Sequence, residues 1–188
     1  MRLISICIIL VLILTNCEQS EYKKLVRNEL KKNVKNDSLF LNLKFGERNE
    51  DYLDKIWELN KKGIISQTDG EYGSVRYPLK LNKLENNVGD INMDFFPRFN
   101  DKKRLDKLTI KFSHQGWAPW NKELFSDKLI IKVLDTIKKW YKGNDFLEAY
   151  NDINNKKSSI FYKIDGDRQF KVYFMEDHEV IAEVEKLK

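Results

Sequence analysis

The chain has 188 residues, 41 % of them hydrophobic and 34 % charged, with a formal net charge of +5. This length predicts one domain with a core of ordinary size, and two cysteines exclude a disulfide-stapled scaffold. Basic and acidic side chains alternate along the sequence, so the small positive excess predicts no nucleic-acid partner.

The first seventeen residues have the pattern of an export signal. Met1-Arg2 precedes an apolar run from Leu3 to Leu14, about 12 residues long, whereas a membrane-spanning helix needs roughly 20. The run ends in Leu14-Thr-Asn-Cys17, which resembles the lipobox of bacterial lipoproteins and implies that Cys17 is acylated, with palmitate for instance. An ordinary secretory signal and an uncleaved anchor are the alternatives. We therefore expect a signal peptide at 1–16 and a lipid-anchored mature chain.

Residues 17–37 are expected to form a tether with a marginal helix, since apolar residues recur there only every fourth position. A single α+β domain is then expected over 38–188. It opens with a predicted strand at 38–45 and a helix from Asn49 to Lys62, ended by Gly63. The predicted core face of that helix consists of Leu53, Ile56, Trp57 and Leu59.

Alternating apolar and polar residues predict strands over 75–81, 91–95 and 108–112. A helix from Asp127 to Lys142 follows, with Ser126 as its predicted N-cap and with one face made of Leu129, Ile130, Val133, Leu134, Ile137, Trp140 and Tyr141. We expect a short helix within 144–155, and then strands at 160–164, 170–174 and 180–184, the first two joined by an Asp165-Gly166 hairpin turn. The predicted fold class is α+β: an antiparallel meander sheet with helices on one face, with two halves, 38–114 and 121–188, as a further option.

The sequence offers few groups for catalysis. The two histidines, His114 and His178, lie in separate strands without further ligands at metal spacing, and no nucleophile or phosphate-loop motif occurs, so we predict no metal and no cofactor. The stretch Ser113-His-Gln-Gly-Trp117-Ala-Pro-Trp120 differs from the rest, because two tryptophans flank a loop. His114, Trp117 and Trp120 are therefore the candidate binding residues, with core packing of both rings as the alternative. Of the two rings, Trp117 is the one expected to be exposed.

Two segments carry a resemblance to known proteins. Residues 44–65, beginning Lys-Phe-Gly-Glu-Arg, and 112–124, Phe-Ser-His-Gln-Gly-Trp-Ala-Pro-Trp-Asn-Lys-Glu-Leu, are similar to uncharacterised lipoproteins of Gram-negative envelopes. At the level of fold, the order of elements resembles the small lipoproteins of outer-membrane protein assembly and β-lactamase-inhibitor-like domains. The resemblance to lipoproteins implies an envelope location. The resemblance to β-lactamase-inhibitor-like domains implies a sheet that binds a protein.

These observations lead to one functional expectation and one alternative. We expect a non-enzymatic binding or scaffold domain, attached to the outer or inner membrane through its N-terminal lipid and facing the periplasm or the exterior, with an envelope protein as partner. The alternative is a hydrolase of envelope polymers or peptides that uses scattered carboxylates such as Glu123 and Asp127. An aromatic groove would favour binding, and paired carboxylates in a deep pocket would favour hydrolysis.

Overall fold

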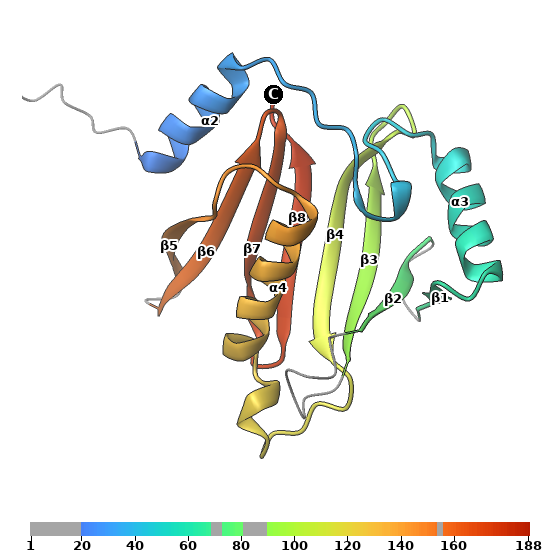
Figure 1. Cartoon of the computed structure of the whole chain (residues 1–188), viewed down its shortest axis with the longest axis vertical. Helices are drawn as coiled ribbons and strands as arrows, with labels where there is room; N and C mark the ends of the chain where they lie inside the picture. Colours follow the sequence, from blue (N-terminus) through green and yellow to red (C-terminus); the bar gives the residue numbers. More distant parts are fainter. Residues whose placement is uncertain (1–19, 69–72, 81–89, 154–155) are drawn as a thin grey trace, which may run out of the picture.

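The computed structural model describes residues 20–68, 73–80, 90–153 and 156–188 (Figure 1). The predicted signal peptide and Cys17 lie outside these residues. In the part that is described, no helix is both long enough and apolar enough to cross a bilayer.

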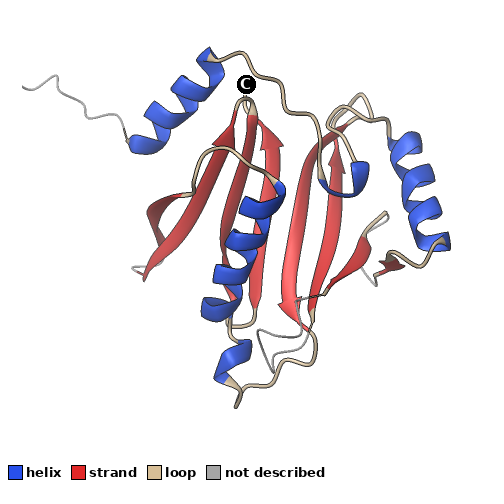
Figure 2. Cartoon of the chain, viewed as in Figure 1, coloured by secondary structure: helices blue, strands red, loops and turns tan. Residues whose placement is uncertain are grey.

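Helices and strands occupy most of the described chain. The helices are α2 (Glu21–Lys31), η1 (Phe40–Asn42), α3 (Asn49–Lys61), η2 (Lys122–Leu124) and α4 (Ser126–Trp140). The strands are β1 (Ser66–Gln67), β2 (Val75–Leu79), β3 (Ile91–Phe99), β4 (Leu105–His114), β5 (Leu147–Ile153), β6 (Lys156–Asp165), β7 (Arg168–Glu176) and β8 (Glu179–Lys186). Figure 2 shows the strands at the centre and the helices on their face and margins.

All eight strands form one antiparallel sheet in the order β1-β2-β3-β4-β8-β7-β6-β5. Two four-stranded meanders therefore meet where β4 pairs with β8, with Leu108 opposite Val184 and Phe112 opposite Val180. The α+β class with a meander sheet is confirmed. Since β4 and β8 pair along their length, the two meanders share one sheet.

The core lies on one face of this sheet, which α4 crosses in front of β7 and β8 (Figure 1). Alternate strand residues point to the same face. Leu129, Ile130, Val133 and Ile137 of α4 are buried there with Leu108, Ile110 and Phe112 of β4, Phe170 and Val172 of β7, and Val180, Ala182 and Val184 of β8. Burial of this α4 face confirms the predicted phase of the helix.

The three α-helices do not share a face. Tyr22 of α2 contacts the Tyr162 ring, at 4.5 Å between centroids, and donates a 2.7 Å hydrogen bond to Gln169. Gln169 neighbours Phe170 along β7 and so points to the face opposite the core of α4. The expectation of helices on a single face therefore fails at α2, because the polar face of the sheet also accepts a helix.

Three local predictions are corrected. The predicted strand 38–45 is a loop around η1, closed by a single bridge between Ser38 and Lys44. The helix expected within 144–155 is strand β5, because Leu147 to Ile153 pair with β6. In α3, Trp57 is 62 % exposed and Tyr52 is fully buried in its place.

Candidate functional site

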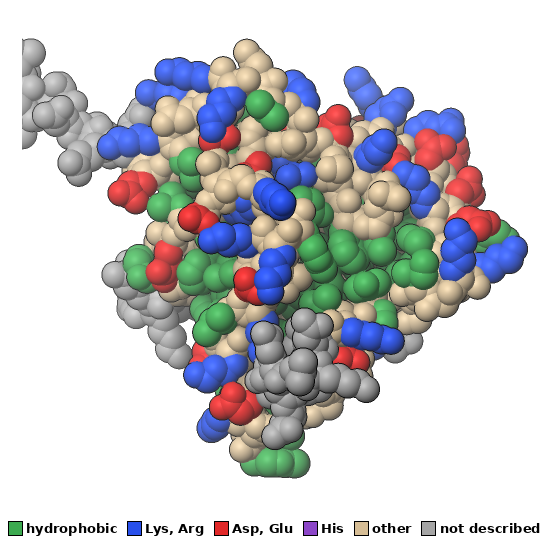
Figure 3. All heavy atoms as spheres, viewed as in Figure 1, with side chains coloured by type: hydrophobic (Ala, Val, Ile, Leu, Met, Phe, Trp, Pro, Cys, Tyr) green, Lys and Arg blue, Asp and Glu red, His purple; other side chains and the backbone are tan. Residues whose placement is uncertain are grey.

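An open groove of about 570 Å³ lies on the core face of the sheet, beside the C-terminal end of α4. Figure 3 shows hydrophobic side chains gathered on the surface between α4 and α3, where this groove lies. The lining residues come from the loop before α3, the end of α3, the end of α4 and the start of β7: Asn36, Ser38, Leu39, Phe40, Leu41, Asn42, Leu59, Ile64, Trp140, Tyr141, Lys142 and Arg168.

Phe40 is the centre of the aromatic part of the groove. Its ring stacks on Trp140 at 4.5 Å and on Phe95 at 5.4 Å, and meets the edge of Tyr77 at 5.0 Å. Offset and edge-to-face pairs at these distances stabilise an aromatic cluster beyond the area that it buries. Trp140 nevertheless remains 38 % exposed, so the cluster presents aromatic surface to solvent.

The loop that holds Phe40 is strained. Leu41 and Asn42 both have left-handed backbone angles, with φ of 56° and 59°. This conformation is uncommon for leucine, since the Cβ atom crowds the following carbonyl. The loop is held by burial of Leu39 and Leu43 and by a 2.7 Å hydrogen bond from the Leu39 N–H to the Leu43 carbonyl. Strain of this kind persists where the surroundings impose it, often at binding sites.

Arg168 forms the charged end of the groove. Its guanidinium lies 4.5 Å from the Tyr141 ring centroid and donates a 2.8 Å hydrogen bond from Nη1 to the Ser38 carbonyl. The Nε atom is buried and has no hydrogen-bond partner among the described residues. Burial lowers the pKa of the Arg168 guanidinium, while nearby Tyr141 and Asp165 act to raise it. Burial also raises the pKa of the Tyr141 hydroxyl to about 12, so this phenol is neutral at physiological pH.

The charges that line the groove are both positive, Lys142 and Arg168, and no described carboxylate contributes to it. General acid–base hydrolysis of glycosides needs two carboxylates facing each other across a cleft. The groove instead combines an aromatic surface with two cations, which suits a ligand that carries an apolar group and a carboxylate. The acidic residues named for the hydrolase alternative, Glu123 and Asp127, are exposed on η2 and the first turn of α4.

A buried polar cluster supports the Arg168 end of the groove. Lys163 is fully buried, donates a 2.5 Å hydrogen bond to the Asn144 carbonyl and lies 3.1 Å from the Asp165 carboxylate. Asp167 accepts a 2.7 Å hydrogen bond from Lys186. The predicted Asp165-Gly166 turn is thus the tip of the β6–β7 hairpin, and its two aspartates are bound by protein groups. No cluster of metal ligands occurs among the described residues.

The three candidate residues from the sequence lie away from this groove. His114 ends β4 and is 3 % exposed. Trp117 is half-buried, with its ring 4.7 Å from His178 and 6.0 Å from Phe125, whereas Trp120 is 84 % exposed. The expected order of exposure is therefore reversed: the turn after β7 covers Trp117, and Trp120 faces solvent.

The groove and the tryptophan loop lie at opposite ends of β7. Arg168 begins the strand, and His178, which contacts Trp117, follows its end. The nine residues of β7 span about 26 Å at roughly 3.3 Å per residue. The structure thus separates two surfaces, and the sequence pointed only to the second.

Sequence reasoning missed Phe40, Trp140 and Arg168 as a group. Trp140 was assigned to the core face of its helix, and Phe40 was placed in a strand. The only local signal near Arg168 was the hairpin turn that precedes it. No spacing in the sequence relates the three positions, because pairing of β4 with β8 and of β6 with β7 brings them together.

Searches against protein-family models, curated proteins and solved structures return no match to this chain. The resemblance to envelope lipoproteins therefore stays an expectation, and the functional argument depends on the geometry above.

Proposed function

We propose that this protein is a lipid-anchored, non-enzymatic binding domain of the bacterial cell envelope. Its groove takes up a segment of a partner protein that carries an apolar side chain beside a carboxylate. The observation that carries the proposal is the aromatic surface around Phe40 and Trp140, flanked by Lys142 and Arg168 without any described carboxylate in the lining.

Partial exposure of the aromatic cluster supports binding over simple core packing. A core cluster would be covered on all sides, whereas Trp140 and the strained Leu41 stay open to the groove. Exposed aromatic surface edged by polar groups is typical of interaction sites. The strain at Leu41 and Asn42 keeps Phe40 in position before a partner arrives, which reduces the ordering that binding requires.

The two cations support a carboxylate in the partner. Arg168 is buried, donates to the Ser38 carbonyl and has its Nη2 atom 4.0 Å from the Asp165 carboxylate, so the orientation of its guanidinium is fixed before a ligand binds. Lys142 is exposed at the end of α4, where a positive side chain also faces the negative end of the helix dipole. A carboxylate at this end of the groove would gain charge-assisted hydrogen bonds.

The anchor is supported by the sequence of residues 1–17. The expected acyl chain on Cys17 would place the domain at a membrane surface. In cells that make the full chain, Cys17→Ser should release the protein from the membrane fraction or leave the precursor unprocessed. Correctly cleaved, membrane-bound Cys17→Ser protein would contradict lipid anchoring.

The groove is tested by photo-crosslinking in the membrane-anchored full chain. A photoreactive phenylalanine replaces Ile64, which lines the groove, or Asp177, which is exposed beyond the far end of β7. We expect an adduct specific to position 64 whose partner peptide contains an apolar residue next to Asp or Glu.

A pair of charge reversals serves as the matched control. Lys142→Glu should reduce the adduct several-fold, whereas Lys102→Glu, at an exposed turn outside the groove lining, should leave it unchanged. Equal yields from positions 64 and 177, or equal effects of the two reversals, would contradict the proposal.

A further inference from the structure

Helix α2 presents an unusually one-sided set of charges. Lys23, Lys24, Arg27 and Lys31 are all exposed, and at 100° per residue they fall within an arc of about 100° around the helix. Among the described residues, no carboxylate lies within ion-pair distance of any of the four, in contrast to Lys32, which pairs with Glu29.

The opposite side of α2 is fixed to the sheet. Tyr22 donates its hydrogen bond to Gln169, and the buried Glu29 accepts a 3.1 Å hydrogen bond from the Gly166 N–H. Tyr22 and Glu29 lie within about 20° of each other on the helix and nearly opposite the centre of the basic arc. Docking of this side therefore turns the basic arc away from the domain.

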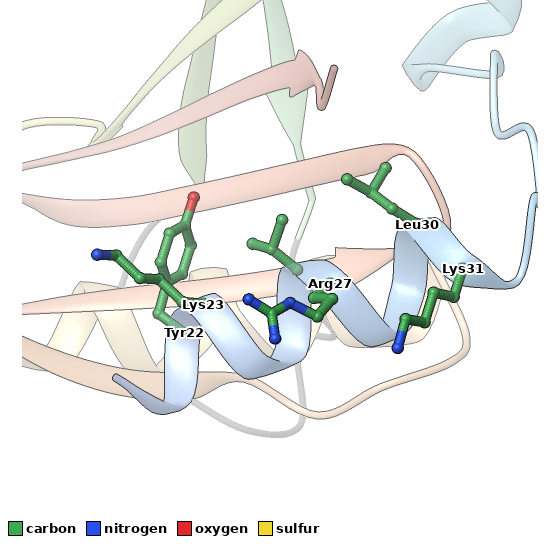
Figure 4. Close-up of a pocket in the computed structure, with 6 residues that line it drawn as sticks. Tyr22, Lys23, Arg27, Leu30 and Lys31 are labelled. Atoms are coloured by element: carbon green, nitrogen blue, oxygen red, sulfur yellow. The ribbon is translucent and has the colours of Figure 1, made fainter. Parts of the chain in front are cut away.

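An apolar row runs beside the basic row. The apolar row consists of Tyr22, Val26 and Leu30, each followed in the sequence by a residue of the basic row, Lys23, Arg27 and Lys31. These six residues line a shallow groove of about 550 Å³ (Figure 4). Adjacent apolar and basic rows are the pattern of helices that lie in a membrane interface, where apolar groups reach the acyl boundary and basic groups meet the phosphates.

The position of α2 in the chain favours the same surface. Cys17 is four residues before Glu21, so even a fully extended connection holds the start of α2 within about 14 Å of an acylated Cys17. The negative surface potential of anionic lipids acts within about one Debye length, roughly 8–10 Å under physiological conditions. The short connection thus allows the basic arc to come within this distance of the headgroups when the anchor is inserted.

We propose that the basic arc of α2, together with Val26 and Leu30 beside it, forms a second membrane contact, which binds anionic phospholipid headgroups and orients the domain on the bilayer, while Tyr22 stays on the sheet. This inference depends on the proposed lipid anchor at Cys17. Positive charge next to a lipid anchor provides the second signal that strengthens and orients attachment.

The test uses the acylated full-length product, purified from membranes and reconstituted into phosphatidylcholine vesicles with or without phosphatidylglycerol. Because Cys17 would be the only mature cysteine and would be acylated, an introduced cysteine takes a fluorescent label uniquely. The label is placed by Asn28→Cys, next to the basic arc, or by Asp177→Cys, beyond the far end of β7. A headgroup-nitroxide lipid then quenches labels that approach the surface.

We expect strong quenching at position 28 in anionic vesicles, at least several-fold weaker quenching there in neutral vesicles or high salt, and none at position 177. Triple reversal of Lys23, Arg27 and Lys31 to Glu should reduce the quenching to the neutral-vesicle level. Triple reversal of Lys61, Lys62 and Lys102 to Glu changes the net charge equally and should leave it intact. A thermal melt of both triple variants confirms that they fold.

Two outcomes would overturn the inference in distinguishable ways. Equal quenching in the two triple variants, with the acyl chain present by mass spectrometry, would refute the α2 contact and leave the anchor standing. A mature chain without the acyl group would refute the anchor and, with it, this orientation.

Discussion

Trp117 and Trp120 provide a matched pair, since they are the same residue type, three positions apart, in contrasting surroundings. Trp117 packs against His178 and Phe125, whereas Trp120 is 84 % exposed. Truncation of each to alanine should therefore separate packing from surface display. The expected free energies of unfolding follow from these contacts.

Full burial would make a tryptophan-to-alanine change cost about 3–5 kcal/mol. Trp117 is only half-buried, which lowers this cost. Its buried Nε1 also has no hydrogen-bond partner among the described residues, so truncation removes the penalty of burying an unpaired N–H, about 1–3 kcal/mol. We expect Trp117→Ala to cost about 2 kcal/mol. Trp117→Phe keeps most ring contacts and removes the unpaired N–H, so it should cost less than about 1 kcal/mol. Trp120→Ala should change stability by less than about 0.5 kcal/mol.

Chemical denaturation of the three variants measures these differences directly, and a thermal melt should show Trp117→Ala lower by about 4–8 °C for a chain of this size. A loss of stability in Trp120→Ala equal to that in Trp117→Ala would show that the loop packs differently. If Trp117→Phe were as damaging as Trp117→Ala, the assignment of an unpaired indole N–H would be wrong.

Three further predictions concern the core, the buried charge and the response to acid. Leu129→Ala, on the buried side of α4, should cost about 2–5 kcal/mol, and Ile131→Ala, 63 % exposed on the same helix, less than about 0.5, as measured by urea titration. Lys163→Met should lower the free energy of unfolding by about 3–5 kcal/mol, because it leaves Asp165 without its 3.1 Å partner. Addition of Asp165→Asn should recover part of this stability. Full additivity of the two changes in a double-mutant cycle would refute the coupling. Burial acts to raise the pKa of the Asp167 carboxyl, but hydrogen bonds from Lys186 and the Asn36 N–H outweigh it and hold that pKa below its ordinary value. A depressed carboxyl pKa contributes stability above the unfolded value, near 4, that is lost as the pH falls through the folded value, so unfolding scans at decreasing pH should show a shallower acid loss in Asp167→Asn.

The sequence correctly predicted the elements in which the spacing of apolar residues matches the face that is buried in the structure. The face of α4 containing Leu129, Val133 and Ile137 is buried as its spacing indicates, and the alternation in 91–95 and 108–112 corresponds to β3 and β4. Both signals are local consequences of burying one side of a regular element, so a single sequence is enough to reveal them.

The failures occur where tertiary structure decides between local options. Leu147 and Tyr150 have helical spacing, yet pairing with β6 makes the segment a strand. The spacing of Leu39, Leu41 and Leu43 is typical of a strand. The chain instead turns at Leu41, while Leu39 and Leu43 stay buried. A left-handed leucine has no signature in the sequence, and this turn places Phe40 against Trp140.

Strand β7 relates the two proposed contacts to the exposed Trp120. At its beginning, Arg168 lines the groove and Gln169 holds Tyr22 of α2; beyond its end, His178 packs on the loop that displays Trp120. If α2 lies on the bilayer, the sheet stands between the membrane and the groove, which is on the opposite face from α2, and the Trp120 loop lies about 26 Å from Arg168 along the strand direction, the length of β7. A short peptide cannot occupy both surfaces. A partner in the groove therefore approaches the core face of the sheet beside the beginning of β7, whereas any contact with Trp120 is made beyond the other end of that strand.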